Sequence, residues 1–175
     1  RYTMTKCKRL SLAVLALLFT LGLMPATIAA QEPLTVLSGA ELTRVVPPGY
    51  YFQGLSAPTQ RRNSAAVRFG TDRYVVAGMV DTSGYSADIR AKYEGFLITD
   101  SAIVIGGSDL STGAYGFGFS ENGRLNILDL SGKELLSVPT TTDTALRRPR
   151  PLMMTKVGDR LRFYSGRNYV EISPK

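Results

Sequence analysis

Short runs of β-forming residues dominate the chain from Val67 onward, and Gly, Asn, Asp and Ser turns separate them. This punctuation is typical of a meander of antiparallel strands. The runs that we expect to form strands are Ala65 to Phe69, Arg73 to Val80, Glu94 to Thr99, Ala102 to Ile105, Ala114 to Ser120, Arg124 to Leu130, Glu134 to Val138, Leu152 to Val157, Arg160 to Tyr164 and Tyr169 to Ile172. The pattern predicts an all-β fold, an antiparallel barrel or sandwich of about ten strands.

Alternation within single runs predicts which side chains face the core. Leu161 and Phe163 alternate with arginines, so both should point inward. In the segment AYGFGFS, Gly116 and Gly118 share the face opposite two phenylalanines. A bare glycine face is typical of a sheet that bends sharply or is covered by a bulky neighbour. Further along, the pair Asn122-Gly123 predicts a hairpin with a two-residue type I′ turn.

Residues 31 to 66 lack this punctuation, and we expect them to form an irregular lead-in with one short helix. Ser38 and Glu41 have the spacing of a capping box, which predicts that the helix covers Gly39 to Val46. The polar stretch from 57 to 64 is typical of a loop.

The first 30 residues have the layout of a secretory signal peptide. A basic start precedes an apolar run from Leu10 to Met24, and small residues follow up to Ala30. The run has about 15 residues, fewer than the roughly 20 that cross a bilayer. We therefore expect cleavage near Ala30 and no transmembrane segment in the mature chain. Residues 1–3 should lie upstream of the true start at Met4.

The composition excludes several kinds of catalytic group, metal site and disulfide, and it is more informative in this respect than any motif. The 175 residues are 44% apolar and 20% charged, which suits one folded domain in which residues 31–66 and 67–175 belong together. There is no His and no Trp, and the single cysteine is Cys7. Imidazole bases, thiol nucleophiles, His/Cys zinc sites and structural disulfides are thereby excluded from the mature domain.

Charge gives little reason to expect a nucleic-acid partner. Removing the first 30 residues takes away four of 21 basic residues and none of 14 acidic residues, so the net charge falls from +7 to +3. This small excess of positive charge does not indicate nucleic-acid binding. Export and a mature chain without cysteine fit a secreted or periplasmic bacterial protein.

Two arginine-rich segments are the best candidates for ligand contacts. One is Gln60 to Asn63, and the other is Arg147 to Pro151, where two prolines favour an extended backbone. The planar guanidinium suits carboxylates and phosphates, so these segments predict an anionic envelope polymer or a protein partner. Solvated or internally paired arginines are the alternative. The candidate ligand-binding residues are Arg61, Arg62, Asn63, Arg147, Arg148 and Arg150, with Tyr50 and Tyr51 as the floor of a pocket or as core residues.

The segment ITDSAIVIGGSDLSTGAYGFGF carries a resemblance to a known group of proteins. Its Ile105-Gly106-Gly107 turn and the later Leu110, Gly113 and Tyr115 resemble a hairpin of small secreted bacterial β-sandwich or β-barrel proteins of uncharacterised function. The resemblance covers about a tenth of the chain. It implies an architecture and carries no activity or site residue.

We therefore expect a secreted, non-catalytic binding or interaction module of the bacterial cell envelope, with no cofactor and no metal. One alternative is a glycan hydrolase, which needs two carboxylates facing each other across a cleft. Four carboxylates around one loop are candidates for this pair, namely Asp81, Asp88, Glu94 and Asp100. Positions at strand ends or on the surface are a simpler explanation for these residues. A second alternative is an assembly subunit that pairs through an edge strand.

Overall fold

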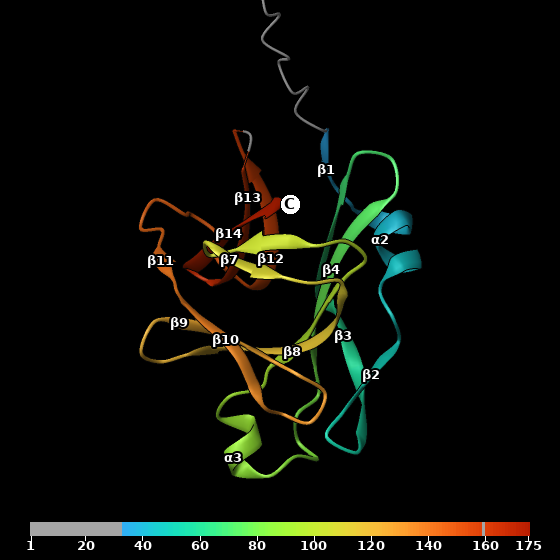
Figure 1. Ribbon diagram of the computed structural model, residues 1–175, viewed down its shortest axis with the longest axis vertical. Helices are drawn as coiled ribbons and strands as arrows, with labels where there is room; N and C mark the ends of the chain where they lie inside the picture. Colours follow the sequence, from blue (N-terminus) through green and yellow to red (C-terminus); the bar gives the residue numbers. More distant parts are fainter. Residues whose placement is uncertain (1–32, 159) are drawn as a thin grey trace, which may run out of the picture. The chain divides into compact units, whose positions relative to one another are not determined.

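Two antiparallel sheets build the domain in the computed structural model, which describes residues 33–158 and 160–175 (Figure 1). Within that part of the chain there are fourteen strands and two short helices. The fold is therefore all-β, as the pattern predicts, and it is a sandwich of two sheets and not a closed barrel. The expected signal peptide lies outside the described residues.

One sheet has eight strands in the order β1-β3-β4-β5-β8-β9-β10, with β2 paired to β3. Its strands are β1 (Leu34–Val36), β2 (Gly49–Phe52), β3 (Leu55–Phe69), β4 (Arg73–Val80), β5 (Gly95–Thr99), β8 (Gly113–Ser120), β9 (Arg124–Leu128) and β10 (Glu134–Pro139).

The other sheet has six strands in the order β12-β13-β14-β6-β7, with β11 paired to β14. Its strands are β6 (Ile103–Ile105), β7 (Ser108–Leu110), β11 (Thr141–Thr142), β12 (Arg150–Val157), β13 (Arg160–Gly166) and β14 (Asn168–Pro174).

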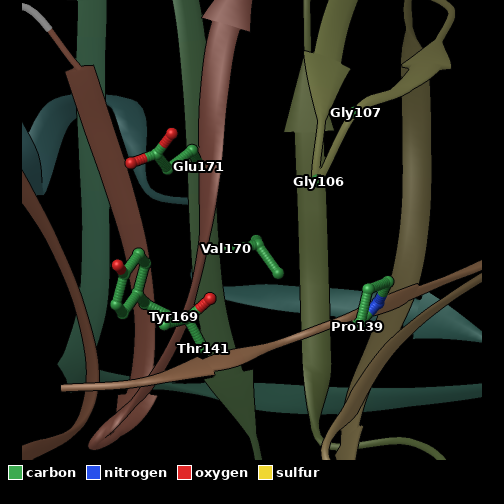
Figure 2. A pocket seen from close by; sticks show the side chains of 7 residues that line it. All are labelled: Gly106, Gly107, Pro139, Thr141, Tyr169, Val170 and Glu171. Carbon is green, nitrogen blue, oxygen red and sulfur yellow. The ribbon is translucent and has the colours of Figure 1, made fainter.

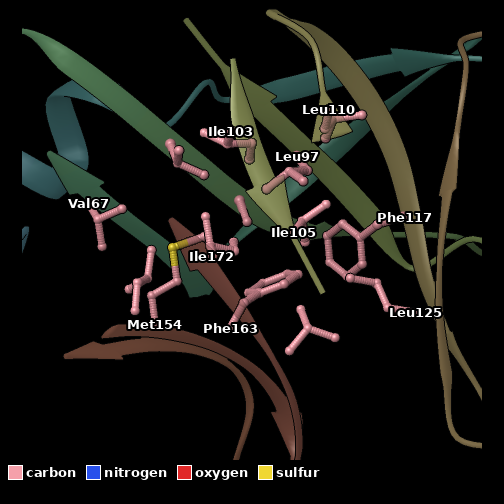
Figure 3. Packing of buried hydrophobic residues seen from close by; sticks show 14 of the residues in the cluster. Val67, Leu97, Ile103, Ile105, Leu110, Phe117, Leu125, Met154, Phe163 and Ile172 are labelled. Carbon is pink, nitrogen blue, oxygen red and sulfur yellow. The ribbon is translucent and has the colours of Figure 1, made fainter. Parts of the chain in front are cut away.

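The larger sheet is buried on both faces. One face packs against the smaller sheet, where Phe117, Leu161 and Phe163 are fully buried in the main core (Figure 3). The inward positions of Leu161 and Phe163 are confirmed. A second core covers the opposite face and includes Phe52 and Phe96. Because alternate residues of a strand feed the two cores, the central strands are apolar on both sides.

The bare glycine face predicted in β8 is covered by bulky neighbours, as expected. A Cβ on Gly116 would lie 2.6 Å from the ring of Phe52, and one on Gly118 would lie 2.3 Å from the carbonyl oxygen of Lys92. The Phe52 ring stacks on Tyr93 at a centroid distance of 3.9 Å. Glycine is therefore required in β8 because the second core lies directly on the backbone.

The lead-in is more regular than its sequence indicates. We expected residues 57 to 64 to be a loop, but they belong to β3, which pairs with β2 and then with β4. Polar side chains are tolerated there because most of this stretch faces solvent and the backbone hydrogen bonds do not depend on them. The prediction of an irregular segment from 31 to 66 was wrong in this respect.

Both helices are short. Helix α2 (Gly39–Val45) lies where the capping pattern predicts it, but the Ser38 side chain makes no capping hydrogen bond. Gly39 has a φ of 56°, so the first turn does not follow the regular geometry that a capping box needs. Helix α3 (Ala87–Arg90) precedes β5 (Figure 1), and its Ile89 packs against the second core.

The hairpin at Asn122-Gly123 is confirmed, but its turn type is different from the prediction. The amide of Gly123 donates to the carbonyl of Ser120 at 3.0 Å, and Gly123 has a φ of 74° while Asn122 does not have a positive φ. This is a three-residue connection, in which a turn is followed by a left-handed glycine. Strand pairing resumes at Ser120 and Arg124.

Replacement of Gly123 by Val should lower the free energy of unfolding by about 1 kcal/mol or more, because a β-branched residue is strained at positive φ. Gly123→Asn should cost less, since Asn tolerates the left-handed region. Chemical denaturation of the two variants provides the comparison. Equal midpoints would show that the backbone conformation at this position contributes nothing.

Replacement of Gly118 by Ala should lower the free energy of unfolding by more, about 1–3 kcal/mol, because the new methyl group meets a backbone atom that cannot rotate away. Gly84→Ala is the matched control, since the nearest atom there is a flexible leucine methyl at 3.6 Å. Thermal unfolding should separate the two alanine variants. A Gly118→Ala protein as stable as the control would contradict the close approach of the Lys92 backbone to β8.

Candidate functional site

Arg61 and Arg62 project from an ordered bulge inside β3. Thr59 pairs with Val80 and Ser64 pairs with Gly78, so β3 has three more residues than β4 between these pairs. Side chains hold the bulge: Asn63 Nδ2 donates to Gln60 Oε1 at 2.9 Å, and Ser64 Oγ donates to the Arg61 carbonyl at 2.7 Å. Bulges of this kind often aim side chains at functional surfaces.

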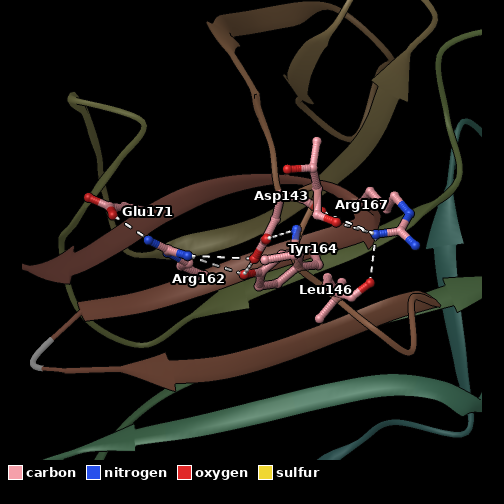
Figure 4. A network of polar contacts seen from close by, with 8 residues as sticks. Asp143, Leu146, Arg162, Tyr164, Arg167 and Glu171 are labelled. Carbon is pink, nitrogen blue, oxygen red and sulfur yellow. Dashed lines mark hydrogen bonds and ion pairs between the residues drawn. The ribbon is translucent and has the colours of Figure 1, made fainter.

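The second arginine segment follows a loop that polar contacts fix in place (Figure 4). The carboxylate of Asp143 accepts from the amide of Ala145 at 3.0 Å and from the hydroxyl of Tyr164 at 2.9 Å. A single guanidinium nitrogen of Arg167 donates to the carbonyl of Leu146 at 2.6 Å and lies within reach of two further loop carbonyls. Arg147 and Arg148 therefore emerge from a preorganised base, as the sequence predicts for a loop.

Arg150 and Ser64 come together on one groove between the two sheets. The hollow has a volume of about 360 Å³ and lies where β12 passes β1, β3 and the start of α2. Strands β3 and β12 lie side by side, yet no strand pairing joins them among the described residues. The residues of its walls that carry side chains are Val36, Leu37, Ser38, Leu42, Ser64, Ala65, Arg150, Leu152, Met153 and Met154. Ser64 directly follows the first arginine segment and Arg150 belongs to the second, and Arg150 is the arginine that lines the hollow.

The arginines of the two candidate segments differ from those of the smaller sheet. Arg160 pairs with Glu171 at 2.6 Å, and Arg162 lies 3.7 Å from carboxylate oxygens of Asp143 and Glu171. Arg162 also lies 4.3 Å from the ring centre of Tyr169. In contrast, six exposed arginines have no side-chain hydrogen bond or ion pair to another described residue: Arg44 on α2, and Arg61, Arg62, Arg147, Arg148 and Arg150 of the two candidate segments. Their charge is not neutralised within the part of the chain that the structure describes.

The remaining candidates from the sequence have other roles. Tyr50 is 9% exposed and stacks on Phe96 at 5.0 Å, so it belongs to the second core and not to the groove. Tyr51 is 59% exposed on the outer side of β2. The Asn63 side chain donates a hydrogen bond to Gln60 within the bulge. Sequence reasoning did not find Leu152, Met153 and Met154, because an apolar run in a strand gives no signal that it will line a groove.

The four carboxylates of the hydrolase alternative hold the backbone in place or face solvent. Asp81 accepts from the amide of Ser83, and this hydrogen bond lowers the pKa of Asp81. Burial raises the pKa of Glu94, which accepts from the amide of Phe119 at 3.0 Å. The remaining two are Asp100, which accepts from the amide of Tyr74 at 2.7 Å, and Asp88, which is exposed on α3. None of the four lines the groove.

A second hollow, of about 310 Å³, lies beside β14 (Figure 2). The Gly106-Gly107 turn forms one side, and Tyr169 and Glu171 form the other. Its one charged group already has partners in the chain, because Glu171 pairs with Arg160 and Arg162, and the Arg162 guanidinium also covers the Tyr169 ring. The groove at Arg150 is therefore the better candidate for a charged ligand.

Comparisons with known proteins add no assignment. No protein family, curated protein or solved structure matches the chain. In the described residues there is no group of three or more His, Cys, Asp or Glu that could hold a metal ion. Neither described helix has the length and apolar character that a membrane crossing requires. The site is therefore argued from its own geometry.

The burial of Tyr50 generates a testable prediction. Its hydroxyl is buried without a hydrogen-bond partner among the described residues, and burial raises its pKa to about 12. Tyr50→Phe should raise the free energy of unfolding at neutral pH by about 1 kcal/mol, because an unpaired buried hydroxyl is removed. Denaturation of Tyr51→Phe provides the control, whose midpoint should not change.

The same variant should change the response to alkali. Because the folded pKa is raised from 10.0 to about 12, the unfolded chain releases this proton first, and stability is lost as the pH rises through that window. Tyr50→Phe should reduce this loss of stability at alkaline pH. Burial also raises the pKa of Tyr93, so Tyr93 should account for part of the loss that remains in the variant. An identical alkaline profile in the wild type and in Tyr50→Phe would contradict the burial of this hydroxyl.

Proposed function

We propose that the mature chain is a secreted, non-catalytic module that binds an anionic ligand at the groove between β3 and β12. The observation that carries the proposal is the set of five exposed arginines in the two candidate segments, which have no partners among the described residues and one of which lines a hollow of about 360 Å³. A hollow of that size is in the range of small-molecule sites, about 300–1,000 Å³.

Preorganisation supports the same function. The bulge at Gln60–Asn63 and the loop at Asp143–Leu146 are both held by hydrogen bonds of their own. Arginines that emerge from ordered segments lose less conformational freedom on binding than arginines on free loops. Guanidinium groups form paired hydrogen bonds with carboxylates and phosphates, so an anionic group is the chemistry that the site fits.

The test uses retention of the protein on immobilised dextran sulfate as an anionic polymer. Arg147→Glu with Arg148→Glu should weaken binding about tenfold, since two exposed ion pairs of up to about 1 kcal/mol each are lost. Binding of the wild type should also weaken as salt rises above physiological strength, where the screening length is about 8 Å.

The control is Lys133→Glu with Lys156→Glu, which changes the net charge equally at two exposed lysines outside the groove. This control should retain most of the binding. Equal loss in both double variants would attribute retention to net charge alone and overturn the proposed site. Retention that does not respond to salt would overturn it as well.

A further inference from the structure

The walls of the groove are mainly apolar, which a purely ionic ligand does not explain. Seven of its eleven lining residues have apolar side chains, and the lining contains no carboxylate. Leu152 and Met154 form the base of the groove from the main core at 2% and 4% exposure, whereas the accessible apolar lining is Val36, 39% exposed at the rim, with the partly exposed Leu42 and Met153. The groove therefore combines apolar walls with one guanidinium group.

We propose that the groove binds a single acyl chain with a carboxylate head group, in other words a free fatty acid, with the chain along Val36, Leu42 and Met153 and the head at Arg150. This inference rests on the proposed function, because it names the class of anion that the arginines bind. Charge complementarity identifies the head, since Arg150 has no partner among the described residues. The apolar lining identifies the chain.

The side chains of the groove suit a flexible chain better than a rigid ring. Met153 and Met154 are unbranched and polarisable, and such side chains fill irregular gaps and adapt to different occupants. The groove is also bounded by two strands without a hydrogen-bonded ladder between them among the described residues, so side-chain packing sets its width.

Arg150 is well placed to bind the head group. Its guanidinium can donate two parallel hydrogen bonds to a carboxylate, a geometry that a planar fork favours. The two neighbouring arginines, Arg147 and Arg148, are exposed and lie only two and three residues away in the chain. They add positive potential near the head without lining the groove.

The experiment is calorimetric titration of the protein with octanoate, decanoate and dodecanoate below their micelle concentrations. Each added methylene should increase affinity about fourfold while the groove still has room, because each one buries apolar surface. Decyl maltoside carries the same chain with a neutral head and should bind at least tenfold more weakly than decanoate. Decyl phosphate tests the other common anionic head and should bind less tightly than decanoate.

Variants separate the contributions of the chain and the head. Val36→Asp places a carboxylate at the apolar rim and should weaken decanoate binding at least tenfold, while Val157→Asp, at a valine of similar exposure outside the groove, should not. Arg150→Gln should weaken decanoate about tenfold but leave decyl maltoside unchanged. This pattern would not arise from a general loss of stability.

Three results would overturn the inference. Affinity that does not depend on chain length, with dextran sulfate binding still sensitive to Arg147 and Arg148, would leave the proposed function standing without the acyl chain. Tighter binding of decyl phosphate than of decanoate would assign the head to a phosphate. Dimerisation that Val36→Asp abolishes, without any binding of decanoate, would assign the groove to a second copy of the chain. Failure of every anion to bind would instead reject the proposed function itself.

Discussion

The stack of Phe52 on Tyr93 over the backbone of Gly116 is the contact on which the architecture depends. Because β8 carries no side chain at that position, the aromatic rings lie directly on the larger sheet and seal its second face. A sheet buried on both faces holds its central strands rigidly. The long strand β3, which carries one wall of the groove, is thereby fixed along the part that packs into the two cores.

Charge is divided between two kinds of surface in this domain. On the smaller sheet, Arg160, Arg162 and Arg167 are used to bind carboxylates, an aromatic ring and loop carbonyls, and they stabilise the region between β11 and β14. The arginines of the two candidate segments have no such partners among the described residues. One set therefore builds the scaffold that positions the other, since Arg167 fixes the loop from which Arg147 emerges.

The sequence predicted the fold class well and the site only in part. Glycine turns and alternation located ten of the strands, since these signals are local. The strand at 57–64 was missed because its pairing depends on backbone partners in β2 and β4, and its polar side chains resemble a loop. The type of the Asn122-Gly123 turn also depends on strand register, which a dipeptide does not encode. The arginines were found as candidates because they cluster in the sequence, whereas the apolar lining that includes Leu152 and Met154 exists only where strands of the two sheets meet.

The absence of a ladder between β3 and β12 in the described part of the chain separates the width of the groove from the hydrogen bonding of the two sheets. Strand pairing within each sheet fixes the scaffold, but the gap between these two edges is filled by side chains alone. A change in side-chain volume at Met153, which is only half-buried, can widen or narrow the gap while every backbone hydrogen bond remains. The width of the groove can therefore change by substitution while the scaffold is retained.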